Sequence, residues 1–239
     1  MIPILNSQND VELHLILGRK IFRFLPFLKS LKLCMKFVTI HNQTSPEYQD
    51  IKSFIENIFY RSYRAKISVN FPKIMALTTK NNKLISAVGV RSAADNRLFI
   101  EQYLDKEIEE ILSDLTKSKV VRSDIVEIGS LASGQRNAAR CLYVALAAYL
   151  KNEKYKYAVM TSTEYLQKYF AKAGLKPQII ANADKARLIN KEVDWGTYYE
   201  TNPKVMMMDV ANGYQVLNLF LGIEAIPSMT RLYPHINYV

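Results

Sequence analysis

The chain has 239 residues, 49% of them hydrophobic, and a formal net charge of +10. This hydrophobic content suffices for a buried core, and with only 8 Gly and 8 Pro the composition excludes a collagen-like, linker-like or disordered chain. The positive charge predicts an acidic partner, and because no helix-turn-helix, zinc-finger or aromatic ribonucleoprotein pattern is present, we expect no specific nucleic-acid binding.

The residues that bind metals or form disulfides are few and scattered. Cys34 and Cys141 are far apart in apolar surroundings, and His14, His41 and His235 lack the spacing of a metal site. We therefore expect no disulfide framework, no metal, and a reducing, cytoplasmic compartment. The longest uncharged apolar stretches are shorter than the roughly 20 residues that span a bilayer, so a membrane-spanning segment is not expected.

A basic amphipathic helix is predicted near the N-terminus, over residues 13–36. Its apolar face contains Leu17, Ile21, Phe24, Leu25 and Leu28, and its basic face contains Arg19, Lys20 and Arg23. Such a helix either packs on the core of the protein or lies on an anionic membrane, at its inner face, through residues 13–33. The sequence leaves both alternatives open.

From residue 36 onward the pattern is that of an alternating α/β domain. The elements expected in its first half are a strand at 36–42, a helix from 45 to 59, strands at 74–79 and 84–91, an extended segment at 97–103 and a helix at 106–115. The strands at 74–79 and 84–91 flank a polar turn and should pair antiparallel. Asp105 is expected to cap the last helix.

A β-α-β-α-β run follows in the second half. Its expected elements are strands at 125–131, 157–161 and 178–182 and helices at 138–150 and from 161 to 174. Thr161 has the spacing of a capping residue, and Gly174 ends the last helix. Such connections favour parallel neighbours, and ligands of open α/β sheets bind where the sheet changes character.

Four short motifs in this domain resemble the thermostable hemolysin family. They are FIEQYLD at residues 99–105, VEIGSLAS at 126–133, AARCLY at 138–143 and WGTYY at 195–199. That family is related to the acyl-homoserine-lactone autoinducer synthases, and residues 125–175 resemble the donor-binding half of the GNAT acyltransferases. The resemblance implies an α/β (α+β) fold with a mixed, splayed β-sheet flanked by helices on both faces. It divides the chain into an N-terminal segment (1–35), a GNAT-like domain (36–205) and a C-terminal extension packed on it (206–239).

The resemblance also implies N-acyl transfer to the amine of a small molecule. The acyl donor would be acyl-CoA or an acyl-phosphopantetheine carrier protein, used as a co-substrate, with no tightly bound cofactor. An acyl carrier protein is acidic, so the charge of +10 favours it slightly as the partner. The strand that carries Glu127 would offer backbone groups to the pantetheine arm.

Glu127 and Glu101 are the candidate catalytic residues. Glu127 interrupts an apolar central strand and shares a face with Ile125 and Gly129, so its carboxylate should face a polar cleft or a partner. A protonated amine cannot attack a thioester, and a partly desolvated Glu suits the role of base, which the autoinducer synthases assign to a glutamate on the matching strand. The alternative is a structural ion pair with Arg91 or Arg64. Glu101, on the extended segment, would bind the ammonium group of the substrate.

The donor phosphate is expected at the start of the helix after the central strand, where backbone N–H groups and the helix dipole converge. The expected donor-binding residues are Leu131, Ala132, Ser133, Gly134, Gln135, Arg136, Asn137, Ala138, Ala139 and Arg140. The GNAT pattern is Gln or Arg, two residues, Gly, one residue, Gly or Ala. Gly134, Asn137 and Ala139 take its positions, so this version is degenerate and suits one phosphate better than a pyrophosphate.

Several further residues have expected roles around the reacting groups. Many GNAT enzymes protonate the departing thiolate with a tyrosine at the position of Phe170, so the acid is either the adjacent Tyr169 or absent. Thr161, Ser162 and Trp195 are the candidate substrate-binding residues. Residues 206–208, three methionines, would line an acyl tunnel or, more simply, pack in the core.

Two competing functions remain open on the sequence. The first is a peripheral membrane-active, hemolysin-like protein in which the acyltransferase-like body is a scaffold. The second is a catalytically inactive binding module, which the degenerate phosphate loop and Phe170 would permit.

Overall fold

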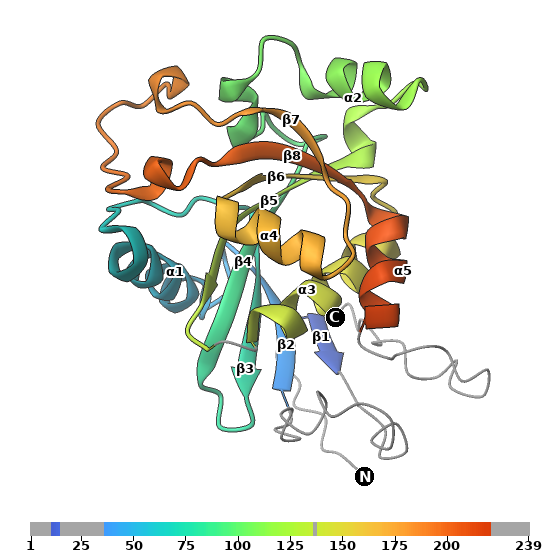
Figure 1. Ribbon diagram of the computed structural model, residues 1–239. Coiled ribbons are helices and arrows are strands. Elements are labelled where there is room, and N and C mark those ends of the chain that lie inside the picture. The colour runs from blue at the N-terminus through green and yellow to red at the C-terminus, as the bar shows by residue number, and fades with distance from the viewer. Residues whose placement is uncertain (1–10, 15–35, 136–137, 221–239) are drawn as a thin grey trace, which may run out of the picture.

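The computed structural model describes residues 11–14, 36–135 and 138–220, whose strands form one mixed sheet in the order β1-β2-β3-β4-β5-β6-β8-β7 (Figure 1). The strands are β1 (Val11–His14), β2 (Lys36–Asn42), β3 (Lys73–Thr79), β4 (Leu84–Ser92), β5 (Ile125–Ser133), β6 (Tyr157–Ser162), β7 (Gln178–Asn182) and β8 (Lys204–Asp209). The α-helices are α1 (Tyr48–Tyr63), α2 (Ile108–Thr116), α3 (Ala138–Asn152), α4 (Glu164–Lys172) and α5 (Val210–Phe220).

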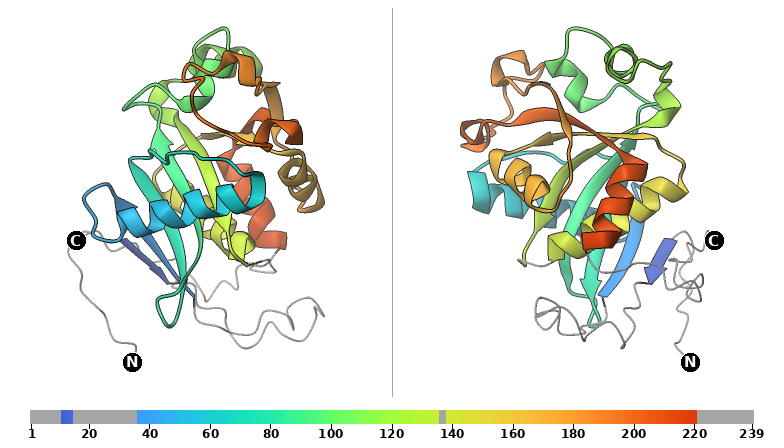
Figure 2. Two further views of the ribbon diagram at one scale, coloured as in Figure 1. Left: turned by 90° about the vertical axis from the view of Figure 1, so that its left-hand side faces the viewer. Right: turned by 45° about the vertical axis from the view of Figure 1, so that its right-hand side comes forward.

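Helices cover both faces of the sheet, as the views in Figure 2 show. On one face, α1 buries Tyr48, Ile51, Ile55 and Phe59, whose spacing of three and four residues places them on one side of the helix. On the opposite face, α3, α4 and α5 enclose a second core that includes Leu142, Leu146 and Leu150 of α3. The expected mixed sheet flanked by helices on both faces is therefore confirmed.

The antiparallel half of the sheet matches the sequence pattern closely. The strand at Lys36–Asn42 has the predicted bounds, and β3 and β4 form the predicted antiparallel hairpin. Asn82 adopts φ +55° in the connecting turn, a left-handed conformation that Asn accepts more readily than most residues. Local turn chemistry thus determines this part of the fold.

The sheet splays between β5 and β6. β5 pairs antiparallel with β4 from Val126 to Ser133, whereas its parallel pairing with β6 extends only from Ile125 to Ile128. Ser130 has φ +51°, and the register between β4 and β5 shifts beside it, so a bulge bends β5 away from β6. Beyond Ile128 the two strands part, and this opening positions the site described below.

The C-terminal part of the sheet differs from the prediction. β8 lies between β6 and β7 and is antiparallel to both, so β7 is not the parallel neighbour of β6 that the β-α-β-α-β pattern favoured. The expected boundary at residue 205 falls inside β8, because Met206 and Met207 pair in the sheet and are buried in its cores. The interpretation of these methionines as core residues is confirmed.

Three local predictions were wrong around the connections. Residues 99–103 form a 3₁₀ helix, η3 (Phe99–Tyr103), instead of an extended segment. Asp105 does not cap α2, which begins at Ile108; its carboxylate pairs with Arg187 at 2.7 Å. Thr161 does not cap α4 either, because the side chain of Thr163 accepts the hydrogen bond from the Leu166 N–H. A tertiary ion pair thus replaces the predicted cap at Asp105, whereas at α4 the cap is local and lies two residues later than predicted.

Most of the predicted amphipathic helix lies outside the described residues. Its ends, at residues 13–14 and 36, belong to β1 and β2, which pair antiparallel at the edge of the sheet. A strand edge with unpaired N–H and C=O groups favours such pairing over a helix. In the described part of the chain, no helix combines the length and the hydropathy needed to cross a bilayer.

Candidate active site

A cavity of about 600 Å³ opens on the α1 face of the sheet, where β5 and β6 part. We call it the cleft. Its walls come from the end of α1, the loop at residues 67–71, η3, the middle of β5 and the segment at residues 189–198. The polar or charged side chains that line it include Arg91, Arg97, Gln102, Glu127 and Thr161. Three of the candidates, Glu127, Thr161 and Trp195, therefore line one cavity.

Glu127 lies at the floor of the cleft with 2% of its surface exposed. Its Oε2 accepts hydrogen bonds from the Arg91 guanidinium at 3.2 Å and from the Phe99 N–H at 3.0 Å, and its Oε1 accepts one from the Ile100 N–H at 2.9 Å. Burial raises the pKa of Glu127 above its usual value, and Arg91 and the two N–H groups oppose that rise. The ion pair considered as the structural alternative thus exists, with Arg91 as the partner.

Phe71 forms the surface against which Arg91 rests. The Arg91 guanidinium lies 4.8 Å from the centroid of the Phe71 ring and also donates a hydrogen bond to the Asn70 carbonyl. A Cβ atom at Gly89 would lie 2.3 Å from this ring, and one at Gly129 would lie 2.5 Å from it. The Phe71 ring can therefore lie across β4 and β5 only because Gly89 and Gly129 have no side chain. This explains the glycine at position 129, two residues after Glu127 on the same face of β5.

Aromatic rings form one wall of the cleft around Trp195. The Trp195 ring lies 5.8 Å from Phe99, 5.4 Å from Tyr198 and 5.7 Å from Tyr199, measured between centroids. The following Gly196 has φ +49°, and a Cβ there would lie 2.0 Å from the carbonyl oxygen at the end of α1. Close backbone contact therefore explains the glycine of the WGTYY motif.

Glu101 does not line the cleft. It is 2% exposed, and Arg122 donates to its two oxygens at 2.7 and 3.1 Å. The N–H groups of Leu98 and Ile108 also donate to it. Burial alone would raise the pKa of Glu101, but the hydrogen bonds from Arg122 and these N–H groups bring it below its usual value. The carboxylate holds η3 and the start of α2 together.

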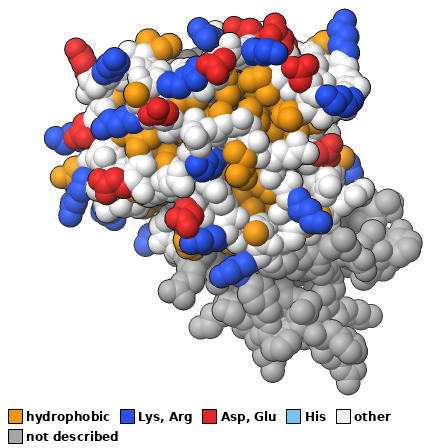
Figure 3. All heavy atoms as spheres, turned by 45° about the horizontal axis from the view of Figure 1, so that its top comes forward, with side chains coloured by type: hydrophobic (Ala, Val, Ile, Leu, Met, Phe, Trp, Pro, Cys, Tyr) orange, Lys and Arg blue, Asp and Glu red, His pale blue; other side chains and the backbone are white. Residues whose placement is uncertain are grey.

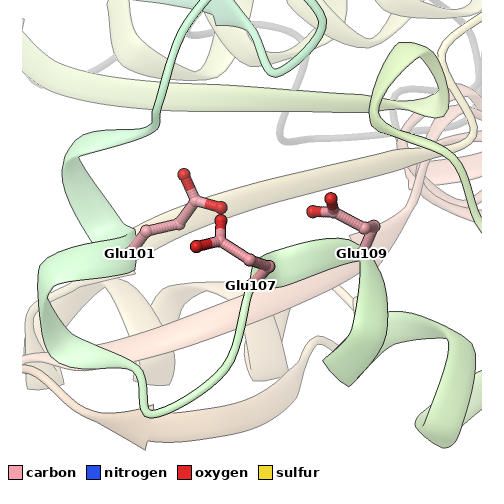
Figure 4. A group of neighbouring side chains, drawn as sticks. All are labelled: Glu101, Glu107 and Glu109. Carbon is pink, nitrogen blue, oxygen red and sulfur yellow. The ribbon is translucent and has the colours of Figure 1, made fainter.

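The carboxylates of Glu101, Glu107 and Glu109 converge beside α2 (Figure 4). The Arg122 guanidinium lies among them, 2.8 Å from Glu109 and 3.5 Å from Glu107. The guanidinium of Arg122 thus already neutralises part of this negative charge, and the four side chains form an ion-pair network centred on Arg122.

The expected donor-phosphate segment is only partly described, because Arg136 and Asn137 lie outside the described residues. α3 begins at Ala138, as predicted. Two N–H groups of this segment have backbone partners: that of Gly134 donates to the Ile85 carbonyl at 2.9 Å, and that of Ala138 donates to the Gln135 carbonyl at 3.1 Å.

The remaining donor-binding candidates lie on either side of this turn. Leu131, Ala132 and Ser133 belong to β5, and the Ser133 hydroxyl donates to the Gln135 carbonyl at 2.8 Å. Ala139 and Arg140 belong to the first turn of α3, and the Arg140 guanidinium lies 5.9 Å from the centroid of Tyr169 on α4. The segment therefore lies at the end of β5 that parts from β6, next to the gap between α3 and α4.

Three buried hydroxyl groups, two at the end of β6 and one on α3, have no partner within the described residues. Within the described residues, the Thr161 Oγ1, the Ser162 Oγ and the Tyr143 hydroxyl are buried and make no hydrogen bond. Thr161 lines the cleft, whereas Ser162, the next residue, is fully buried away from it. Tyr143 was not singled out by the sequence, although it ends the AARCLY motif.

A second, smaller cavity of about 50 Å³ lies under α3, α4 and α5, on the opposite face of the sheet. Its lining is apolar and includes the ring of Tyr143 together with Phe170, Met160 and Met208. Ile128 lines both this apolar cavity and the cleft. The two cavities therefore approach each other where β5 and β6 part.

The comparisons with known proteins agree with this architecture. LasI, an acyl-homoserine-lactone synthase, is 13% identical over 77% of this chain and 94% of its own, with a TM-score of 0.54. FeeM, an N-acyl amino acid synthase from uncultured soil microbes, is 10% identical over 78% of this chain and 98% of its own, with a TM-score of 0.53. At such identities the likeness establishes the fold alone.

The sequence comparisons give the family. No curated protein sequence matches the chain. The sequence model of the family described as thermostable hemolysin matches residues 41–214, which include the sheet from β3 to β8, the cleft and Glu127. Since this match covers well over half of the sequence, the chain belongs to the thermostable hemolysin family.

Proposed function

We propose that this protein is an N-acyltransferase that moves an acyl group from a thioester donor to the amine of a small molecule. The observation that carries this proposal is the buried carboxylate of Glu127, which lines a cavity of about 600 Å³ where β5 and β6 part. The fold shared with an acyl-homoserine-lactone synthase and an N-acyl amino acid synthase supports it.

Glu127 acts as the base in this proposal. Its Oε1 accepts one hydrogen bond, from Ile100, so a second lone pair remains for an N–H of the substrate amine. As the amine nitrogen forms a bond to the acyl carbon, Glu127 takes one of its protons, and the C–S bond then breaks with its electron pair on sulfur. The proton then passes from Glu127 to the released thiolate, so the products are an amide and a free thiol and the carboxylate is regenerated.

Around Glu127 we assign supporting roles to the other candidates. Thr161 and Trp195 line the same cleft and would contact the acceptor. Ser162, the next residue, is fully buried and lines neither cavity, so it would reach the substrate only through Thr161. Glu101 binds no ammonium group in this proposal; through Arg122 it fixes η3, whose N–H groups orient Glu127.

The donor would enter through the gap between β5 and β6. Beyond Ile128 the edge of β5 no longer pairs with β6, so its backbone groups would bind the pantetheine arm, and the apolar cavity under α3 would take the start of the acyl chain. Backbone partners already occupy the N–H groups of Gly134 and Ala138, which favours a donor with one phosphate. Such a donor is an acyl carrier protein, and the reaction would then be cytoplasmic.

Charge also supports a carrier protein, through the net charge of the molecule. On the face shown in Figure 3, basic and acidic side chains are interspersed around hydrophobic ones. The overall charge of +10 would still accelerate encounter with an acidic carrier at low salt.

The experiment is a thiol-release assay with acyl carrier protein or acyl-CoA as donor and a panel of primary amines. Thiol release that requires both donor and amine supports the proposal. Raising the salt concentration from 0.05 to about 0.5 M should slow the carrier reaction more than the CoA reaction, because the Debye length falls well below about 10 Å. Equal salt sensitivity would rule out the carrier as the preferred donor.

The membrane-active alternative is an outcome of the same experiment. The segment expected to contact lipid, residues 13–33, lies outside the described residues except for residues 13–14, which are in β1. Leakage of anionic liposomes without any thioester, together with no thiol release, would favour that alternative.

A further inference from the structure

We propose that the Tyr143 hydroxyl donates a hydrogen bond to the thioester sulfur as the C–S bond breaks. The inference rests on the proposed acyltransferase function and assigns a catalytic role to a residue on α3.

The hydroxyl of Tyr143 is an exception among buried polar groups. Although the ring is partly exposed, the hydroxyl is buried and makes no hydrogen bond within the described residues. Buried hydroxyls nearly always have a partner, and leaving one without costs roughly 1–3 kcal/mol. The Tyr143 O–H group thus lacks an acceptor among the described residues, which is the arrangement expected where a bound ligand supplies the acceptor.

The rings around Tyr143 place it between α3 and α4. Its ring stacks on Tyr169 at 5.7 Å between centroids and meets the edge of Phe170 at 5.6 Å. Both partners belong to α4, and Phe170 is 2% exposed. The Tyr143 side chain therefore lies in the space between the two helices and not on the outer surface of α3.

Tyr143 also lines the apolar cavity together with Ile128, the last residue of β5 that pairs with β6. Ile128 lines the cleft as well, so Tyr143 borders the cavity that reaches the gap between the two strands. Burial raises the pKa of Tyr143 well above its usual value, so the hydroxyl keeps its proton.

Two other hydroxyls lie at the end of β6. Thr161 and Ser162 are the last residues of this strand, beyond its pairing with β5, and their buried side-chain oxygens make no hydrogen bond within the described residues. Tyr143 lines the apolar cavity, Thr161 lines the cleft, and Ile128 lines both, so the two cavities adjoin at Ile128. A thioester whose acyl chain lies in the apolar cavity, with an acceptor amine in the cleft, would have its sulfur here.

The chemistry suits a donor that stays neutral. A thiol has a pKa near 8.5 and a phenol one near 10, so a phenol with a raised pKa does not give up its proton to a thiolate. It can donate a hydrogen bond to the sulfur that gains negative charge when the C–S bond breaks. The departing thiolate obtains its proton from the amine, through Glu127, and Tyr143 remains protonated throughout.

The test compares Tyr143→Phe with the wild type on two acyl donors that differ in the leaving thiol. With an alkyl thioester such as acyl-pantetheine, the variant should lose about 10- to 100-fold in kcat, the effect of one hydrogen bond to a charged group. With an aryl thioester, whose thiol is more acidic and needs less stabilisation, the loss should be only a few fold. Equal losses on the two donors would overturn the proposal.

The matched control is Tyr149→Phe, which removes a phenol hydroxyl from the same helix. That hydroxyl accepts a hydrogen bond from Lys73 Nζ at 3.5 Å, away from the gap. We expect its kcat to stay near that of the wild type on both donors.

Thermal unfolding checks the premise that the Tyr143 hydroxyl has no protein partner. The Tyr143→Phe variant should melt at or above the wild-type temperature, because a buried donor without an acceptor is removed. A Tm several degrees lower would show a structural partner and overturn the proposal. If the wild type itself releases no thiol, the proposed function fails and the inference fails with it. Release by the wild type together with undiminished activity of Tyr143→Phe refutes the inference alone.

Discussion

Replacing Glu127 by Gln tests whether this carboxylate performs chemistry or only stabilises the fold. Gln keeps the size of the side chain and one carbonyl oxygen, which can accept the N–H of Phe99 or of Ile100. Its NH₂ group must then face the other N–H group or the Arg91 guanidinium, which now donate to the two carboxylate oxygens. One charge-assisted hydrogen bond is lost, and Arg91 loses its ion-pair partner.

The loss of stability follows from these contacts. A hydrogen bond to a charged group contributes about 1.5–3 kcal/mol. Stranding a fully buried charge costs about 3–5 kcal/mol, but Arg91 is 16% exposed and keeps its bond to the Asn70 carbonyl, so the cost is smaller. We therefore expect a loss of about 2–3 kcal/mol in the free energy of unfolding, which lowers Tm by roughly 4–12 °C in a domain of this size.

Such a loss cannot by itself explain a large loss of activity at 25 °C. A domain that starts with only about 5 kcal/mol retains about 2 kcal/mol, and at least about 95% of its molecules stay folded. A positioned base contributes roughly 10²- to 10⁴-fold. A fall of kcat by 100-fold or more in the folded variant would therefore be a chemical effect.

The assay measures Tm and steady-state kcat on one preparation, over a range of pH. In the wild type, kcat should rise with pH through the raised pKa of Glu127, because only the deprotonated carboxylate accepts a proton. The variant should lack this rise and bind the donor normally. A folded Glu127→Gln protein with kcat within about twofold of the wild type would refute the role of base.

Three further substitutions test the surroundings of Glu127. Glu101→Gln should lower Tm at neutral pH and leave the kcat of the folded protein largely unchanged. The pKa of Glu101 is lower in the folded state than in the unfolded state, so its carboxylate stabilises the wild type above about pH 4.5. This stabilisation is lost as the pH falls below that value. A large fall in kcat without loss of stability would return Glu101 to the catalytic site. Gly129→Ala places a Cβ 2.5 Å from Phe71, so it should cost about 1–3 kcal/mol and raise KM for the amine; an unchanged Tm and KM would contradict the packing argument. Gly196→Ala should destabilise more than Gly129→Ala, because its Cβ meets the Tyr63 carbonyl at 2.0 Å at φ +49°, and equal melting temperatures would contradict this ranking.

The order of elements was largely predictable, because it depends on local patterns. Hydrophobic spacing located α1 and α3, and the polar turn predicted the β3–β4 hairpin. The insertion of β8 was not predictable in this way, since the stretch Lys204–Asp209 contains three consecutive methionines and has no alternation or turn signal. Its antiparallel place between β6 and β7 depends on which strand edges are available in the folded sheet.

The candidate site was predictable where a residue contradicts its local pattern. A carboxylate in an apolar strand must have partners, and this pointed to Glu127 and named Arg91 as one of them. Glu101 misled the prediction because residues 99–103 look extended, whereas the 3₁₀ helix directs its side chain to Arg122. Phe71 gave no signal, since a phenylalanine in a loop does not reveal which strands it crosses.

By itself, the sequence determined the elements whose signals lie within a few residues of one another, the family, and the one carboxylate that an apolar strand cannot hold without partners. The tertiary structure alone decided which side chains share the cleft, since Glu127, Thr161 and Trp195 come from distant segments. It also decided that the hydroxyl of Tyr143 is buried and meets no partner among the residues that the structure describes. The physical reason is that hydrophobic periodicity is a property of one segment, whereas burial and hydrogen bonding at the site depend on the approach of segments far apart in the chain.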